Sequence, residues 1–277
     1  MTDCNAAHPV SLSNHLMAFG IHDQSDCTSP MPELRQLKRL EQLSRPLNKG
    51  RPKKADVVAF YEFLASPRLA SWGHSNKADA IRVTGEFVLQ ELEGERILDI
   101  GCNMGYLTSW YARQNPAARV LGIDLSPSCI ESAQRQAVKL GIANLRYAIA
   151  DGARFFPDQQ FDSIVDTQGM IDSQTDTASL AKILSWLKPN GKLICVPALG
   201  TLTKFSAFLD ALAPLHVQIT TYNWLTFSAG ANKGAYPAMV IRQDATEFKL
   251  SREELVAEYQ LGLLDFRQQN QLERNCA

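Results

Sequence analysis

Residues 97–108, with the sequence ILDIGCNMGYLT, decide the fold of this chain. Apolar residues on both sides of one acid, Asp99, predict a short buried strand. Gly101 and Gly105 punctuate the turn that follows, and a helix begins after it. Glycine adopts turn conformations that other residues resist, and it lets a backbone come close to a polar ligand at the end of a strand. The stretch therefore predicts a strand, a turn and a helix that together bind a ligand.

Outside this stretch, the chain alternates predicted strands with predicted helices. Strands are expected at residues 96–100, 119–125, 144–150, 161–166, 192–197, 217–222 and 236–242. Alternation of this kind favours a parallel, doubly wound sheet. The last two strands are too close in sequence for a helical crossover, so they are expected to pair antiparallel as a hairpin. We predict an α/β fold with a seven-stranded, mostly parallel, doubly wound sheet, an antiparallel C-terminal hairpin and an N-terminal helical cap.

The chain divides into three predicted segments. Residues 1–75 form the cap, in which amphipathic patterns predict helices at 31–45 and 55–64. Residues 76–245 form the sheet domain, and residues 246–277 form a C-terminal helical extension. A length of 277 residues fits one large domain with such appendages.

Composition narrows the class of protein. The chain is 45% hydrophobic and 21% charged with a net charge of -1, so it has no global basic field and nucleic acid is an unlikely partner. Its six cysteines form no C-x-x-C pair, which favours reduced thiols in a cytoplasmic protein. We expect no membrane contact, because neither a signal peptide nor a long apolar run occurs. The oligomeric state is left open.

The opening stretch resembles the first motif of the class I S-adenosylmethionine (SAM) methyltransferases, in which a strand ending in an acid is followed by G-x-G-x-G. One position differs, because Asn103 replaces the middle glycine. Asparagine tolerates a left-handed backbone better than other residues with a Cβ, so the turn can persist. A dinucleotide-binding fingerprint would instead need glycines where Asn103 and Tyr106 stand.

A second motif extends the resemblance. The turn LKPNGKL, at residues 187–193, is similar to the late L-x-P-G-G-x-L turn of the same family. Together with the predicted terminal hairpin, the resemblance covers residues 77–243. It implies a methyltransferase with SAM as its cofactor.

The resemblance also implies which residues hold SAM. Asp99 holds the turn or meets the amino group of SAM, and Asp124 accepts two hydrogen bonds from the ribose hydroxyls. Asp151 matches the acid of the family that accepts a hydrogen bond from the adenine amino group. The expected cofactor-binding residues are Asp99, Gly101, Cys102, Asn103, Gly105, Tyr106, Asp124, Leu125, Asp151, Gly152 and Thr167.

The acceptor site is weakly encoded, because methyl transfer from a sulfonium mainly needs alignment of the two reactants. His74, in a predicted loop before the first core helix, is a candidate general base. Trp72 in the same segment is a candidate for lining the acceptor pocket. Asp172, after the fourth strand, is a second catalytic candidate, and Trp224 in the predicted loop 222–236 is a second candidate for lining the acceptor pocket. Helix capping and core packing are the alternative roles of these residues.

Three functions are therefore weighed. The first is methyl transfer to an oxygen or nitrogen of a small molecule, since the cap is expected to cover the acceptor. The second is methyl transfer to RNA or protein docked through the basic segment 35–54. The third is SAM binding without catalysis. Aminopropyl transfer on the same fold would need an acidic polyamine site that the sequence does not indicate.

Three histidines near the N-terminus recur every seven residues. His8, His15 and His22 lie between Cys4 and Cys27, which makes a metal site conceivable. We favour solvated loop histidines and predict no metal.

Overall fold

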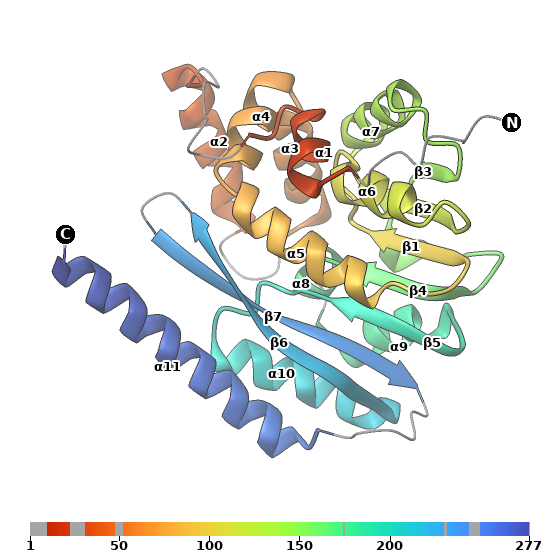
Figure 1. The fold of residues 1–277 in the computed structure, drawn as a ribbon, viewed down its shortest axis with the longest axis vertical. Coiled ribbons are helices and arrows are strands. Elements are labelled where there is room, and N and C mark those ends of the chain that lie inside the picture. The colour runs from red at the N-terminus through yellow and green to blue at the C-terminus, as the bar shows by residue number, and fades with distance from the viewer. Residues whose placement is uncertain are drawn as a thin grey trace, which may run out of the picture.

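A seven-stranded sheet forms the centre of the structure, a computed structural model that describes residues 10–22, 31–47, 52–173, 175–229, 232–243 and 250–276 (Figure 1). Its strands lie in the order β3-β2-β1-β4-β5-β7-β6. Their bounds are β1 Arg96–Ile100, β2 Arg119–Asp124, β3 Leu145–Ile149, β4 Phe161–Asp166, β5 Leu187–Cys195, β6 Val217–Ala229 and β7 Asn232–Gln243. The first five strands pair in parallel, and β7 pairs antiparallel with β5 and β6. The predicted fold class is confirmed.

Helices cover both faces of the sheet. They are α1 Leu12–Met17, α2 Leu34–Leu47, α3 Lys54–Leu64, α4 Pro67–Ser75, α5 Ala78–Glu91, α6 Tyr106–Gln114, α7 Pro127–Lys139, α8 Met170–Ser173, α9 Thr177–Ser185, α10 Leu202–Leu212 and α11 Arg252–Cys276. Ile97 of β1 belongs to a core cluster with residues of α1, α5, α6 and α7, whereas its neighbour Leu98 belongs to a second cluster with residues of α9, α10 and α11. Successive side chains of a strand point to opposite faces, so a central strand covered on both sides is apolar throughout.

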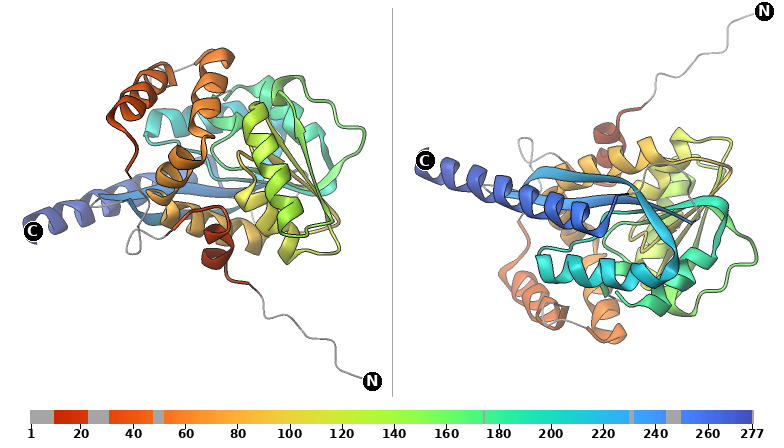
Figure 2. Two further views of the ribbon diagram at one scale, coloured as in Figure 1. Left: turned by 90° about the horizontal axis from the view of Figure 1, so that it is seen from above. Right: turned by 90° about the horizontal axis from the view of Figure 1, so that it is seen from below.

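The N-terminal region separates into two parts. Helices α2, α3 and α4 gather at the carboxyl ends of the parallel strands, while α1 packs against α5 and α6 (Figures 1 and 2). At the other terminus, α11 packs on α10 and β7, and its last turns project away from the rest of the chain in both views of Figure 2. Within the described ranges, no helix is both long and apolar enough to cross a membrane.

Two local predictions were wrong. The predicted loop 222–236 belongs mostly to β6 and β7, which form a longer hairpin than expected. Its β-branched and aromatic residues, such as Thr226 and Phe227, favour strand, and the glycine-rich tip hid that signal. The segment before the first core helix is the helix α4 and not a loop; Ser66 and Pro67 begin it in the manner typical of a helix start.

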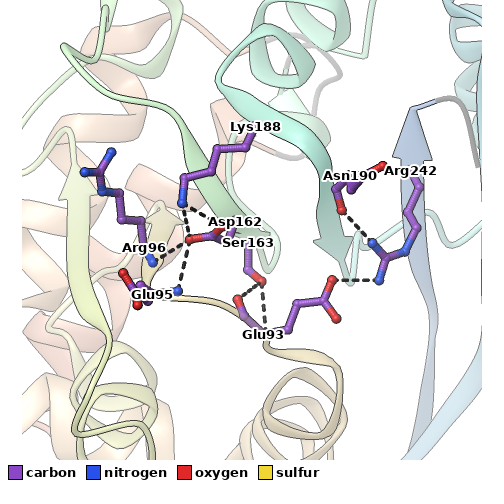
Figure 3. Close-up of polar contacts among 8 residues, drawn as sticks. All are labelled: Glu93, Glu95, Arg96, Asp162, Ser163, Lys188, Asn190 and Arg242. Carbon is purple, nitrogen blue, oxygen red and sulfur yellow. Dashed lines mark hydrogen bonds and ion pairs between the residues drawn. The ribbon is translucent and has the colours of Figure 1, made fainter.

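A polar cluster ties the strands together at their amino ends, the edge opposite the carboxyl ends that face the cap (Figure 3). The Asp162 carboxylate of β4 accepts hydrogen bonds from the backbone N–H groups of Glu95 and Arg96, at 3.0 and 2.9 Å. The Lys188 ammonium donates to both oxygens of the same carboxylate at 2.7 Å. One half-buried acid therefore joins β1, β4 and β5.

The hairpin is attached at the same edge (Figure 3). Arg242 of β7 donates to the Glu93 carboxylate at 2.7 Å and to the Asn190 carbonyl at 2.8 Å. Lys192, which is only 5% exposed, lies 3.2 Å from the other oxygen of Glu93. These contacts set the register of β7 against β5 and leave the carboxyl ends of the strands free for a site.

Candidate functional site

A cavity of about 690 Å³ opens at the carboxyl ends of β1, β2 and β4. One side is formed by the β1–α6 turn and the strand ends, and the other by α3, the end of α4 and the start of α5. The sheet reverses its order between β1 and β4, which is where doubly wound sheets bind ligands. Small-molecule sites usually measure roughly 300–1,000 Å³, so the cavity has the size of one.

The β1–α6 turn uses three residues with left-handed backbone. Gly101, Asn103 and Gly105 have φ angles of 72°, 52° and 76°. A Cβ at Gly101 would lie 3.1 Å from the Gly169 Cα, whereas a Cβ at Gly105 would lie 2.2 Å from the Tyr147 hydroxyl oxygen. Gly105 is therefore required by packing inside the protein, and it does not line the cavity as Gly101 does.

Asn103 turns its side chain into the protein. Its Oδ1 accepts a hydrogen bond from the Met104 N–H at 2.8 Å and lies 3.5 Å from the Cys129 thiol. Its backbone N–H donates to the Asp124 carboxylate at 2.9 Å. The asparagine thus replaces a glycine by holding the left-handed turn with its own amide, and its backbone lines the cavity beside Asp124.

Asp99 lies under the turn and is 3% exposed. The Thr108 hydroxyl donates to its Oδ2 at 2.6 Å. Burial raises the pKa of Asp99 to about 7, against the opposing effect of this hydrogen bond, and the nearby acids Asp166 and Asp124 raise it further. A ligand ammonium group beside Asp99 would favour the carboxylate, which agrees with the expected contact to the amino group of SAM.

Asp124 ends β2 and accepts backbone hydrogen bonds on both oxygens, from Asn103 and, at 2.8 Å, from Ser126. Burial raises its pKa, although these hydrogen bonds oppose the shift. A carboxylate has about four lone-pair positions, so two remain for the ribose hydroxyls that we expect Asp124 to bind.

Asp151 carries a partner that the sequence did not indicate. The Lys54 ammonium of α3 donates to its Oδ2 at 2.8 Å, and the Ala153 N–H donates to its Oδ1 at 3.1 Å. Burial alone would raise the pKa of Asp151, but these hydrogen bonds outweigh burial and lower it. The acid expected to contact adenine therefore also holds the cap.

A second acid fixes the cap to the sheet domain. Glu62 of α3 accepts hydrogen bonds from the Ser126 hydroxyl at 2.5 Å and the Ser128 N–H at 3.0 Å, and from the Ser128 hydroxyl. These donors lie at the start of α7, next to Asp124. Nothing in the local sequence around Glu62 indicates this long-range pairing.

Four more of the expected cofactor residues line the cavity; they are Cys102, Tyr106, Leu125 and Thr167. Gly152 also lines it, at the start of a short 3₁₀ turn, Gly152–Arg154. Of the expected cofactor set, all but Gly105 border the same cavity.

Of the four residues predicted to contact the acceptor, two line the cavity and two do not. His74, on α4, and Asp172, on α8, both line the cavity. Trp72 is on α4 but is absent from the cavity wall. Trp224 lies on β6 against α11, where its ring is 5.1 Å from that of Tyr259 and its Nε1 donates to the Glu258 carbonyl at 3.3 Å. The structure therefore does not bring either tryptophan to the cavity.

The pKa values of His74 and Asp172 are shifted in opposite directions. His74 is 6% exposed and its Nε2 has no hydrogen-bond partner; burial and the nearby Lys77 lower its pKa to about 4. Asp172 accepts a hydrogen bond from the Ala198 N–H at 2.8 Å and has accessible surface toward the cavity. Burial, with repulsion from Asp166, raises the pKa of Asp172 to about 7.

His15 is not the solvated loop histidine that we favoured. It is fully buried on α1, with Nε2 3.0 Å from the Tyr106 carbonyl oxygen and 2.9 Å from the Ser109 hydroxyl. Burial lowers its pKa to about 4, so a neutral ring docks α1 behind the cofactor turn. His8, Cys4 and Cys27 lie outside the described residues, and the described part of the chain holds no group of acids, histidines and cysteines suited to a metal.

Comparison with known proteins agrees with this geometry. Residues 97–191 match a family model described as a methyltransferase domain. A phosphoethanolamine N-methyltransferase of Triticum aestivum is 27% identical over 193 residues, which are 65% of this chain and 38% of that protein. The 23S rRNA (uracil(747)-C(5))-methyltransferase RlmC of Vibrio cholerae is 28% identical over 53% of this chain and 32% of its own length. The chain thus spans well under half the length of either relative.

A solved structure is similar in fold to this chain. The [4+2]-cyclase SpnF superposes with a TM-score of 0.55 at 18% identity, over 70% of this chain and 98% of that one. The strand order, the cavity at the switch point and the acids at the strand ends suit a nucleoside ligand. With the family match, residues 97–191 belong to a methyltransferase domain, and the fold around them is that of the class I SAM-dependent methyltransferases, whose cofactor is SAM.

Proposed function

We propose that this protein transfers the methyl group of SAM to an oxygen or nitrogen atom of a small molecule. The observation that carries the proposal is the single cavity shared by the strand ends and the cap. Beyond the acids that suit the cofactor, apolar residues of α3 line it; they are Val57, Val58, Phe60, Tyr61 and Leu64. An apolar wall of this kind suits a small acceptor and limits the access of water to the displacement.

Asp172 is the group that we propose as the base for an acceptor that must lose a proton. A general base works best when its pKa lies near the operating pH, and that of Asp172 is about 7. The pKa of His74, about 4, makes its ring a much weaker base. We therefore propose that His74 contacts a ligand through a hydrogen bond and that Asp172 orients and deprotonates the acceptor.

A polymer acceptor is the second candidate. Arg35, Lys38, Arg39 and Arg45 are exposed on α2, and the rRNA methyltransferase among the relatives acts on RNA. Lys49 and Arg51 of the same basic segment lie outside the described residues. The apolar lining of α3 supports the small acceptor over this alternative. A cytoplasmic location stays a prediction from the sequence.

The proposal is tested by following S-adenosylhomocysteine formation from SAM with a panel of small phenols, amines and carboxylates, and with total RNA as the polymer arm. We expect turnover with a small acceptor, and we expect D172N to lower kcat at least about tenfold, in the range of lost general-base catalysis. D158N, at an exposed acid outside the cavity, is the matched control. SAM binding without turnover of any acceptor would favour a non-catalytic protein, and turnover of RNA alone would favour the second candidate.

A further inference from the structure

The cavity opens to solvent beside α8 and α10. Most of the residues that line it are buried or half-buried, and the exposed ones mark the opening. They lie mainly on α8, on α10 and in the loop after β5; they are Asp172, Ala198, Lys204 and Ala207. Lys77, which immediately precedes α5, is also exposed at the lining. An acceptor that enters beside α8 and α10 therefore passes one acid, Asp172, and one lysine, Lys204.

Asp172 has no ion pair within the described residues. It accepts one hydrogen bond, from the Ala198 N–H at 2.8 Å. The carboxylate is exposed at the cavity, yet protein atoms crowd around it, so burial and repulsion from Asp166 raise its pKa to about 7 against the opposing effects of the Ala198 N–H and Lys204. A ligand ammonium group beside Asp172 would stabilise the carboxylate.

Two tyrosines from other elements lie near the same acid. Tyr61 of α3 and Tyr236 of β7 both line the cavity. Burial, with repulsion from Asp124 and Asp172, raises the pKa of Tyr61 to about 12. Burial also raises the pKa of Tyr236; Gln168 opposes this shift and Asp172 adds to it. Both phenols therefore stay neutral, and neutral tyrosines stabilise a nearby cation.

Lys204, in the first turn of α10, supplies a positive charge near Asp172 without binding it. Of the two exposed lysines of the lining, Lys204 is the one that acts on the pKa of Asp172. No ion pair joins the two side chains in the part of the chain that the structure describes. An ammonium alone would be repelled by Lys204, and an anion alone would be repelled by Asp172. The complement of this opening is therefore a ligand with both charges.

We infer that the methyl acceptor is an amine that also carries an anionic group. Its ammonium binds Asp172 beside Tyr61 and Tyr236, and its anionic group, a carboxylate or a phosphate, binds Lys204 at the opening. The apolar side chains of α3 suit the chain or ring that joins the two groups. This inference rests on the proposed function, because it identifies the acceptor of the reaction proposed there.

The same arrangement provides for the proton that methylation must remove. An ammonium has no free electron pair, so Asp172 first takes one proton from it. The nitrogen then forms a bond to the methyl carbon while the bond from that carbon to sulfur breaks, with its electron pair left on sulfur. The product leaves as a methylated ammonium, and Asp172 returns its proton to solvent.

Calorimetry with a matched set of flexible ligands, at saturating S-adenosylhomocysteine, tests the inference. 6-Aminohexanoate and 6-aminohexyl phosphate carry both charges, whereas hexylamine carries only the ammonium and hexanoate only the carboxylate. At least one of the first two should bind about threefold or more tighter than hexylamine and hexanoate, within the range of an exposed ion pair. The tighter of the two identifies the anionic group. Equal binding of all four ligands, or of hexanoate and 6-aminohexanoate, overturns the inference.

Charge reversal at Lys204 gives the sharpest test, and the exposure of this residue makes its variants tolerable to the fold. K204M removes the advantage over hexylamine. K204E reverses the preference, so that 1,6-diaminohexane binds more tightly than 6-aminohexanoate, because both ends of the diamine then meet a carboxylate. K139E, at an exposed lysine of α7, is the matched control and keeps the preference of the wild type. An unchanged preference in K204E overturns the inference.

The failure of the proposed function and the failure of this inference give different results. A wild type that does not bind S-adenosylhomocysteine overturns both. A wild type that binds it and methylates a phenol, but prefers neither ligand that carries both charges, overturns this inference alone.

Discussion

The β1–α6 turn and the cap of α2–α4 border the same cavity but are stabilised in different ways. The turn is held by left-handed backbone at Gly101 and Gly105 and by contacts buried inside the protein. The cap is held by polar side chains of α3, Lys54 and Glu62, and part of its apolar surface stays exposed, including Leu34 at 67%. The difference teaches that the side of the cavity proposed to hold the cofactor is part of the fold, whereas the side proposed to hold the acceptor is attached to it.

The largest effect is expected at Gly105. In G105A the new Cβ meets the Tyr147 hydroxyl and a φ of 76° that alanine resists, so we expect a loss of about 2–5 kcal/mol in the free energy of unfolding. G141A is the control, because Gly141 has a φ of 66° but nothing within 4 Å of an added Cβ; it should lose about 1–2 kcal/mol. Urea denaturation measures both. Equal losses would show that the turn tolerates a side chain.

The second-largest effect is expected at Asp124, on the affinity for the cofactor product. D124A removes the carboxylate expected to meet the ribose and leaves the Asn103 and Ser126 N–H groups without their acceptor. We expect S-adenosylhomocysteine affinity to fall about 10- to 100-fold, the range of lost charge-assisted hydrogen bonds. Calorimetry with D158A, at an exposed acid, provides the control. Unchanged affinity would remove Asp124 from the cofactor site.

A smaller effect follows from the protonation of Asp99. Its pKa of about 7 means that the free protein holds a proton there below pH 7, and a bound ammonium group must displace it. Affinity for S-adenosylhomocysteine should therefore decrease as the pH falls from 8 to 6, by up to about tenfold per unit below the pKa. The expected measurement is a binding profile against pH. 5′-Methylthioadenosine, which has no ammonium group, should show a flat profile, as should D99N with either nucleoside.

The same contrast explains what the sequence could predict. The mostly parallel sheet with its antiparallel hairpin, the acids at the strand ends and the turn that persists at Asn103 follow from local patterns, because periodicity and glycine spacing act within a few residues. The pairing of Lys54 with Asp151 and the burial of His15 behind Tyr106 depend on residues about ninety positions apart. No local pattern specifies such contacts, so the attachment of the cap and the docking of α1 could be learned only from the structure.

The smallest effect is expected at the attachment of the cap. In E62A the hydrogen bonds from Ser126 and Ser128 are lost, but Glu62 is partly exposed and water replaces some of them, so the loss should be about 1 kcal/mol. We expect α2–α4 to be cleaved faster in limited proteolysis, with S-adenosylhomocysteine affinity reduced no more than about fivefold. E131A removes an exposed ion pair within α7 and serves as the control. If E62A instead lowered S-adenosylhomocysteine affinity as much as D124A does, the cap would belong to the cofactor site. The distinction between a turn that is part of the fold and a cap that is attached to it would then be wrong.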